Sequence, residues 1–197
     1  MNVLLLQPLI PKERLWGAYA VEGGIIPPIG LLSIAAYLES KRHKVRILDC
    51  IADKYSEDDL KKYLEKEIFD VVGIPIFTNT AADTYHTAKL VKNFSPDSKV
   101  VLGGVHATIM PERTMQECSE ADYLVVGEGE FTMEELLRQL SSLNPEPKDI
   151  RGLVFRNQSG DIAVNGRREL IPDINVLPLP AYHLVDMSKY IPHPTQY

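Results

Sequence analysis

The sequence predicts an α/β fold, a doubly wound five-stranded parallel sheet followed by a C-terminal β-hairpin and a linker. Three observations support this. Short apolar runs alternate five times with segments of helical period, which indicates a parallel sheet with helices on both faces. The run at residues 100–102 stops at Gly103-Gly104, as a buried strand does when its end must leave backbone room. Apolar residues make up 45% of the chain, which is enough for a core.

The first apolar run, residues 2–7, predicts the first and central strand. It ends at Pro8, which has no amide hydrogen to donate. A second proline, Pro75, is expected to break the third strand. The remaining strands are expected at residues 44–48, 71–76, 100–102 and 123–126.

The helices between these strands begin with favourable signals. Pro28 suits a first helical turn, and Pro111 opens a short helix in the same way. Ser56 is a plausible N-cap, followed by Asp58 and Asp59 in the first turn. The expected helices cover residues 28–41, 56–67, 81–93, 111–118 and 130–142.

Two segments depart from the alternation. Residues 9–27 form a long loop with Trp16 and Tyr19, which we expect to face a ligand or a partner. Near the C-terminus, a β-hairpin is expected, and five prolines after it predict a linker. We therefore divide the chain into an α/β domain (1–143), a hairpin extension (144–171) and a Pro-rich linker to an absent domain (172–197).

Composition excludes several classes of function. The net charge is −6 and no long basic run exists, so nucleic acid is not expected as a partner. No apolar stretch is long enough to cross a bilayer, so we expect a cytoplasmic protein without a membrane partner. The two cysteines, Cys50 and Cys118, lack the spacing of metal ligands.

Four segments carry a more specific pattern. They are Val-Leu-Leu-Leu-Gln-Pro (3–8), Pro-Pro-Ile-Gly-Leu-Leu-Ser-Ile-Ala-Ala-Tyr-Leu (27–38), Val-Leu-Gly-Gly-Val-His-Ala-Thr (101–108) and Val-Val-Gly-Glu-Gly-Glu (125–130). In this order and spacing they resemble the N-terminal cobalamin-binding domain of cobalamin-dependent radical S-adenosylmethionine enzymes. Segments 152–156 and 177–184 look like that family's hairpin and its approach to the catalytic barrel.

The resemblance implies a Rossmann-like domain that holds cobalamin against the C-terminal edge of the sheet. It also implies that the iron–sulfur cluster and S-adenosylmethionine bind in the following radical-SAM barrel, on a CxxxCxxC motif that Cys50 and Cys118 do not make. The parent would then be a methyltransferase or a cyclase. This fragment alone would bind cofactor without catalysing a reaction.

The chain departs from the wider cobalamin-binding pattern at one place. Those domains often carry Asp-x-His-x-x-Gly, in which the histidine ligates cobalt. Gly30 matches the final glycine, but Ile25 and Pro27 stand where Asp and His would be. Proline offers no lone pair to a metal, so we expect binding without a protein histidine from that position.

The resemblance and the chemistry of the strand ends nominate a set of cofactor-binding residues. Gly103 and Gly104 would admit the nucleotide tail, and His106 either binds a corrin amide or the tail phosphate or lies exposed in a loop. Glu128 would oppose a phosphate and suits a charge partner at a helix start. The full set is Gly30, Thr78, Asn79, Thr80, Gly103, Gly104, Val105, His106, Thr108, Gly127, Glu128 and Gly129. No catalytic or metal-ligating residue is assigned.

The three polar residues 78–80 could bind cofactor amides, but at least one is expected to cap the next helix. Gly127 and Gly129 give the backbone freedom beside a helix N-terminus, where an anion is favoured.

Two other functions fit the same architecture. A flavodoxin-like flavin or nucleotide binder is the alternative, although neither GxGxxG nor GxxxxGK[ST] is present. A receiver-like signalling domain would need acidic residues at the end of the first strand, where this chain has Gln7-Pro8.

Overall fold

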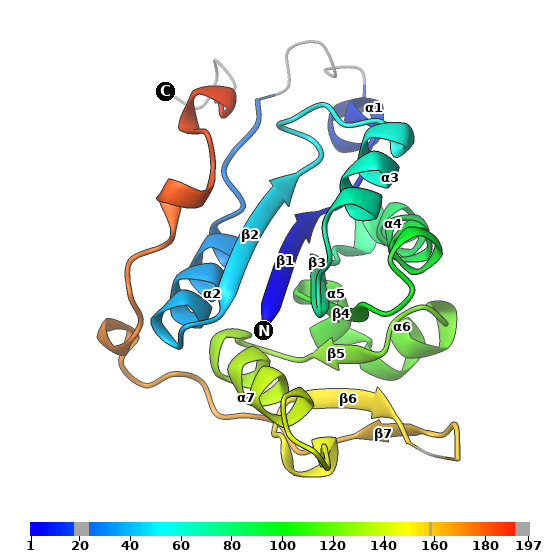
Figure 1. Cartoon of the computed structure of the whole chain (residues 1–197), viewed down its shortest axis with the longest axis vertical. Coiled ribbons are helices and arrows are strands. Elements are labelled where there is room, and N and C mark those ends of the chain that lie inside the picture. Colours follow the sequence, from blue (N-terminus) through cyan, green and yellow to red (C-terminus); the bar gives the residue numbers. More distant parts are fainter. Residues whose placement is uncertain (18–23, 158, 192–197) are drawn as a thin grey trace.

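The computed structural model describes residues 1–17, 24–157 and 159–191. Its centre is a seven-stranded sheet of order β2-β1-β3-β4-β5-β6-β7 (Figure 1). The strands are β1 (Asn2–Gln7), β2 (Lys44–Asp49), β3 (Val71–Pro75), β4 (Lys99–Gly103), β5 (Tyr123–Val125), β6 (Leu153–Arg156) and β7 (Ile162–Val164). The first five are parallel, and β6 and β7 continue the same sheet in antiparallel pairing.

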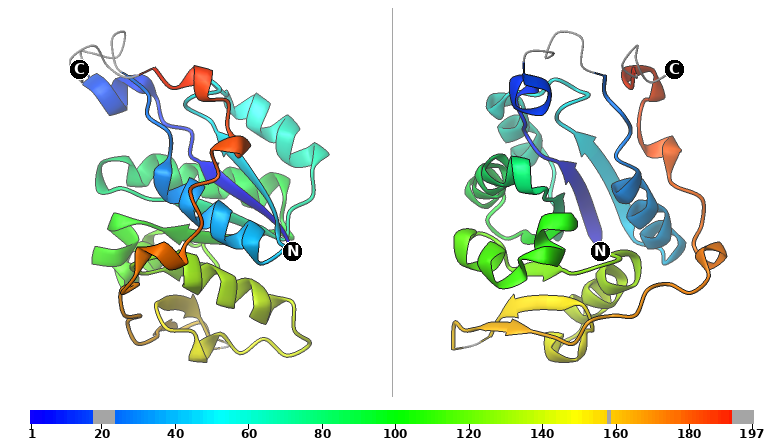
Figure 2. Two further views of the ribbon diagram at one scale, coloured as in Figure 1. Left: turned by 90° about the vertical axis from the view of Figure 1, so that its left-hand side faces the viewer. Right: turned by 180° about the vertical axis from the view of Figure 1, so that it is seen from behind.

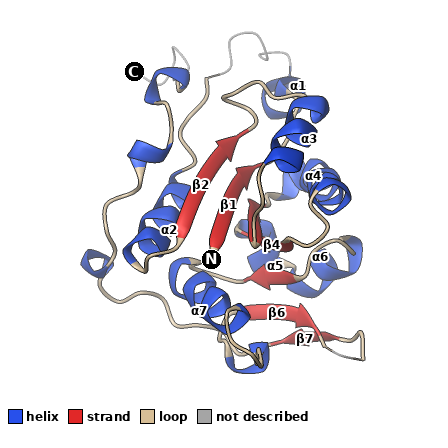
Figure 3. Cartoon of the chain, viewed as in Figure 1, coloured by secondary structure: helices blue, strands red, loops and turns tan. Residues whose placement is uncertain are grey.

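The helices cover both faces of this sheet (Figure 3). They are α1 (Lys12–Trp16), α2 (Ile29–Ser40), α3 (Glu57–Lys66), α4 (Ala81–Phe94), α5 (Val105–Ile109), α6 (Pro111–Glu117) and α7 (Glu130–Leu140). One core layer packs α2 and α7 against the sheet, and the other packs α3, α4, α5 and α6 against the opposite face. The expected doubly wound fold is confirmed.

Strand order explains this division of the helices. In the sheet, β2 lies on one side of β1. The next strands, β3, β4 and β5, follow one another on the other side of β1. Right-handed crossovers therefore place α2 on one face and α3, α4 and α6 on the other. The order reverses between β1 and β3, which is the place where open α/β sheets bind ligands.

Two details of the expected sheet were wrong. The first strand is interior but not central, because the middle position of the five parallel strands belongs to β3. Pro75 does not break β3. It is the last residue of that strand, paired with Gly103, so its missing amide hydrogen falls at the strand's end.

Local sequence signals account for several helix boundaries. Ser56 caps α3 with a complete capping box, in which its hydroxyl accepts from the Asp59 amide and the Asp59 carboxylate accepts from the Ser56 amide. Pro111 begins α6 as expected. The five-residue helices α1 and α5 were not expected, because segments this short show no apolar period. Tyr19 lies outside the described residues.

The described residues after the hairpin, up to residue 191, are bound to the domain. They leave the hairpin and run back beside α2 toward the C-terminal ends of β1 and β2 (Figures 1 and 2). Ala181 is 1% exposed, and its amide donates to the Leu32 carbonyl at 3.1 Å. At the far end, the Ile25 amide donates to the Ile191 carbonyl at 2.9 Å. We call residues 181–191 the strap.

None of the helices in the described ranges has the length and apolar character needed to span a bilayer.

Candidate cofactor site

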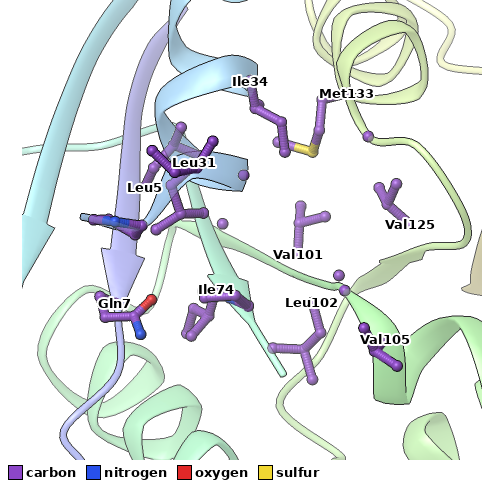
Figure 4. A pocket seen from close by; sticks show the side chains of 18 of the residues that line it. Leu5, Gln7, Leu31, Ile34, Ile74, Val101, Leu102, Val105, Val125 and Met133 are labelled. Atoms are coloured by element: carbon purple, nitrogen blue, oxygen red, sulfur yellow. The ribbon is translucent and has the colours of Figure 1, made fainter. Parts of the chain in front are cut away.

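A cavity of about 580 Å³ opens at the C-terminal edge of the parallel strands (Figure 4). It lies between α2 and α7, over β1, β3, β4 and β5. Figure 4 shows Ile34 of α2 and Met133 of α7 pointing toward one another across this space. Its lining residues are Leu5, Gln7, Ile26–Leu31, Ile34, Gly73–Pro75, Phe77, Val101–Val105, Val125, Gly127–Glu130 and Met133.

Two rows of the sheet form one wall of the cavity. Leu5, Gly73 and Val101 pair side by side and make the inner row, which we call the floor. Two residues closer to the strand ends, Pro75 pairs with Gly103 and Gly103 with Val125, which makes the outer row. Residues two apart on a strand share a face, so both rows look into the space beneath α2 and α7.

Two glycines allow the residues around this space to pack closely. A Cβ on Gly73 would lie 2.9 Å from Leu5 Cδ2 and 3.7 Å from Met133 Cε. A Cβ on Gly129 would lie 2.8 Å from Ile34 Cδ1. A larger residue at either position would therefore displace these neighbours toward the cavity, so the two glycines let Leu5 and Ile34 lie close to the backbone.

The loops after β4 and β5 form the rim. Gly104 has φ +103°, and a Cβ there would lie 3.2 Å from the Ile76 carbonyl oxygen. Gly127 has φ +82°. The Thr108 hydroxyl connects these two loops, donating to the Gly104 carbonyl at 2.9 Å and accepting from the Gly127 amide at 3.0 Å.

The structure brings seven of the residues nominated from sequence to the cavity. These are Gly30, Gly103, Gly104, Val105, Gly127, Glu128 and Gly129. The other five do not line it, and they are Thr78, Asn79, Thr80, His106 and Thr108. Thr108 joins the two loops of the rim through its hydroxyl, Thr78 and Asn79 are exposed after the end of β3, and Thr80 and His106 are buried.

His106 is a buried residue of α5 rather than an exposed loop residue. It is 5% exposed, and the neighbouring Ala107 belongs to the core layer on the face away from the cavity. Its Nδ1 lies 3.1 Å from Thr78 Oγ1 and its Nε2 lies 3.5 Å from the Tyr85 hydroxyl. Burial, followed by the hydrogen bond to Glu117, raises the pKa of Tyr85 to about 12.

Residues 78–80 form a 3-10 turn that leads into α4. Thr78 and Asn79 are exposed, whereas Thr80 is buried. Thr80 occupies the N-cap position of α4, but its side chain makes no capping hydrogen bond there. Its carbonyl accepts from the Thr84 hydroxyl at 3.2 Å. Side-chain capping by one of these three residues was expected, and for α4 that expectation was wrong.

Acidic side chains stand at the outer end of the cavity. Glu128 Oε2 accepts from the Ile171 amide at 2.5 Å, so this carboxylate binds the C-terminal segment of the chain. Glu130 Oε1 accepts from the Ser33 hydroxyl at 2.7 Å, which connects the first turn of α7 to α2. Together with Gln7, these are the polar side chains among the described lining residues.

Sequence reasoning missed the inner part of the site. Leu5, Val101, Ile34 and Met133 were identified only as apolar residues of strands and helices. One signal was available for Gly73, because a glycine inside an apolar strand often marks a close approach of a ligand or another backbone.

None of the described histidines lines the cavity. His86 binds Glu57 at 2.7 Å, His183 binds Glu39 at 3.0 Å and His43 lies 3.3 Å from the N-terminal amine. Pro27 stands at the mouth, in the position where the wider pattern has histidine. Within the described part of the chain, no group of three or more His, Cys, Asp or Glu residues could hold a metal ion.

Comparisons with known proteins agree with this geometry. A family model described as "B12 binding domain" matches residues 16–137. An uncharacterized methyltransferase from Pyrococcus horikoshii is 37% identical over 190 residues, covering 96% of this chain and 40% of that protein. Cytidylyl-2-hydroxyethylphosphonate methyltransferase from Streptomyces wedmorensis is 28% identical, covering 83% and 37%.

Two solved structures share the fold. The radical S-adenosylmethionine methyltransferase TsrM from Kitasatospora setae superposes with a TM-score of 0.68 at 20% identity, covering 84% of this chain and 30% of that one. The cobalamin-dependent S-adenosylmethionine radical enzyme OxsB, with aqua-cobalamin and S-adenosylmethionine bound, gives 0.71 at 17% identity, covering 91% and 24%.

The chain spans 40% or less of the length of these relatives. The family match covers more than half of the chain and includes α2, most of α7, and β3, β4 and β5 of the strands beneath the cavity. It confirms the resemblance seen in the sequence motifs. The chain belongs to the B12-binding domain family.

Proposed function

We propose that the cavity between α2 and α7 receives the nucleotide tail of cobalamin, and that the corrin ring lies across the C-terminal edge of the sheet. The observation that carries this proposal is a glycine-lined cavity that opens at the strand ends, beside the Gly103-Gly104 turn. Its volume lies within the range of about 300–1,000 Å³ that is usual for small-molecule sites.

The surroundings of the mouth suit a large, flat ligand. Ile26 is 67% exposed, Val105 is 53% exposed and Phe77 is 46% exposed, and all three line the cavity's opening. Apolar side chains gathered on a protein surface from separate loops are typical of binding sites. A corrin placed over them would remove these side chains from water and close the cavity below it.

The residues present define what the chain does for the cofactor. Bound cobalamin would supply a cobalt centre that carries a methyl group or assists a radical reaction. The described lining offers no imidazole to this metal, so the chain's own contribution is to bind the tail, orient the ring and exclude water from its lower side. This agrees with the proline at position 27.

The parent protein is proposed to be a radical S-adenosylmethionine enzyme. Relatives that this chain matches over part of their length are called methyltransferases and, in Rubrivivax gelatinosus, an anaerobic magnesium-protoporphyrin IX monomethyl ester cyclase. The iron–sulfur cluster and S-adenosylmethionine would bind in a barrel that follows the strap, and this barrel would be the chain's protein partner. The substrate class is not specified by this chain.

Retention of hydroxocobalamin tests the proposed tail site. In Gly103→Leu, the new Cβ would lie at an ordinary 3.7 Å from Val125 Cβ, so the added side chain enters the cavity without backbone strain. Gly104 is a poorer choice, because its φ of +103° would strain any other residue. The matched control is Gly166→Leu, at an exposed glycine with open space around it.

We expect the wild-type chain and the Gly166 variant to keep the cobalamin absorption spectrum through gel filtration at micromolar concentration. The Gly103 variant should lose it while keeping its circular dichroism spectrum. A wild-type chain that emerges colourless, or a Gly103 variant that retains cofactor as well as the control, would overturn the proposal. Flavin mononucleotide serves as the comparison ligand, and the family match does not favour its binding.

A further inference from the structure

We infer that the cavity selects among corrinoids by the chemistry of the nucleotide base, accepting an apolar benzimidazole-type base and rejecting a purine that carries an exocyclic amine. This inference rests on the proposed function, because it assumes that the base of the tail enters between α2 and α7. It adds a specificity that membership of the family does not itself determine.

The inner half of the cavity is apolar on every described side. Its floor is Leu5, Gly73 and Val101, and its helical walls are Ile34 and Met133. The polar lining residues lie farther out. Gln7 is two residues beyond Leu5 on β1, and Glu130 is the first residue of α7, about one turn before Met133.

The backbone at this depth offers no spare hydrogen-bonding groups to a ligand. Gly73 lies between β1 and β4 and pairs with Leu5 on one side and Val101 on the other. In a strand with neighbours on both sides, the amides and carbonyls are used by the sheet. A polar substituent carried to the floor would therefore lose its water without gaining a partner.

Gly73 sets the depth to which a base can enter. A Cβ at this position would lie 2.9 Å from Leu5 Cδ2, and Leu5 is itself fully buried, so it has little room to move aside. Met133 Cε covers the same point at 3.7 Å. An unbranched thioether adapts its shape to a flat apolar group, which makes Met133 a suitable cover for a methylated aromatic ring.

Three corrinoids distinguish base selection from simple cofactor binding. The chain is titrated with cobalamin, with a cobamide whose base is adenine, and with cobinamide, which has no base. We expect cobalamin to bind about ten- to a hundredfold more tightly than the adenine cobamide, which is the range for leaving one buried polar group unpaired. The adenine cobamide should bind with an affinity close to that of cobinamide.

Met133→Gln tests the cause, since it places an amide at the cavity wall with little change in length. The affinity ratio between cobalamin and the adenine cobamide should narrow severalfold in this variant. It should stay unchanged in Met187→Gln, which makes the same replacement at an exposed residue of the strap. Gly73→Ala should lower the affinity for cobalamin toward the affinity for cobinamide, and the affinity for cobinamide should stay unchanged.

The outcomes separate the two proposals. If cobalamin binds and the adenine cobamide binds equally well, base selection is overturned while the proposed function stands. If neither base-bearing corrinoid binds better than cobinamide, the tail does not enter this cavity and both proposals fail. If the affinity ratio between cobalamin and the adenine cobamide is the same in Met133→Gln and Met187→Gln, base selection is also overturned, because the apolar wall at Met133 would then not be its source.

Discussion

The hydroxyl of Thr108 accepts a hydrogen bond from the amide of Gly127 at 3.0 Å, across the gap between the loops that follow β4 and β5. The same hydroxyl donates to the Gly104 carbonyl at 2.9 Å. Both residues are glycines with positive φ, and because they have no side chains, neither loop is held by side-chain packing of its own at these points. One side chain thus fixes the separation of two loops that border the cavity.

Thr108→Val should loosen this rim. The variant keeps the shape of the side chain but leaves the Gly127 amide without its partner, whereas the Gly104 carbonyl keeps its bond from the Thr108 backbone amide. We expect the free energy of unfolding in urea to fall by about 1–2 kcal/mol, and cobalamin to dissociate faster. Thr108→Ser retains the hydroxyl and should behave as the wild type. Equal dissociation rates for the Val and Ser variants would show that the bridge does not shape the site.

His106→Asn should affect stability without affecting the cofactor. Asparagine can replace the contact to Thr78, whereas the contact to Tyr85 is lost, so unfolding should require about 1 kcal/mol less. Because His106 is buried on the face opposite the cavity, the dissociation constant for cobalamin should change less than twofold. A tenfold weaker complex in this variant would instead assign the histidine to the cofactor.

Introducing one buried charge at Ala181 should detach the strap from the domain. Ala181→Asp places a carboxylate beside α2 at a 1% exposed position, where no partner for it is described. We expect hydrogen exchange to speed up in the peptide 177–191 and at Ile25, whose amide is bonded to Ile191. Met187→Asp, at a 45% exposed position, is the matched control. Unchanged protection at Ile25 would refute a connection between the strap and the mouth.

Asp49 should make stability depend on pH in an unusual direction. Burial raises its pKa above the ordinary 3.8, and the amides of Ala52 and Ile51 only partly oppose this shift. The folded chain therefore holds the proton to higher pH than the unfolded chain does. As pH rises from 3.8 through the raised folded value, this carboxyl lowers the free energy of unfolding.

Asp49→Asn removes this dependence while keeping an oxygen for the two amides and a polar group beside Tyr190. The free energy of unfolding in urea should fall with rising pH in the wild type but not in the variant. The variant's value minus the wild-type value should therefore grow through that window and then level off. Asp58→Asn, at an exposed carboxyl of α3, provides the control. A difference that shrinks as pH rises would contradict the raised pKa.

Much of the architecture could be predicted from local sequence. The alternating apolar runs gave the parallel strands, and Ser56 gave the start of α3, because these features depend on neighbouring residues. The outer part of the candidate site was also accessible, since paired glycines at a strand end are visible in the sequence. Gly103, Gly104 and Gly127 do line the cavity.

The inner part of the site depends on which residues meet across the fold. Gly73 belongs to the floor because Leu5 and Met133, which lie far away in sequence, come within 4 Å of its missing Cβ and leave no room for a side chain there. Docking of the strap likewise depends on contacts between residues far apart in sequence, such as the Ala181 amide with the Leu32 carbonyl and the Ile25 amide with the Ile191 carbonyl. The burial of His106 could not be predicted, because Val105–Ile109 is too short to show a helical period that would indicate which face this residue occupies.

The contact between Ile25 and Ile191 has a consequence for any domain attached after residue 197. Six residues span at most about 20 Å when fully extended. If that domain began directly after residue 197, its first residue would lie within about that distance of Ile191, which binds Ile25 next to the mouth of the cavity. Its effective concentration at the cofactor would be high without a large interface, and lengthening this short tether would dilute it.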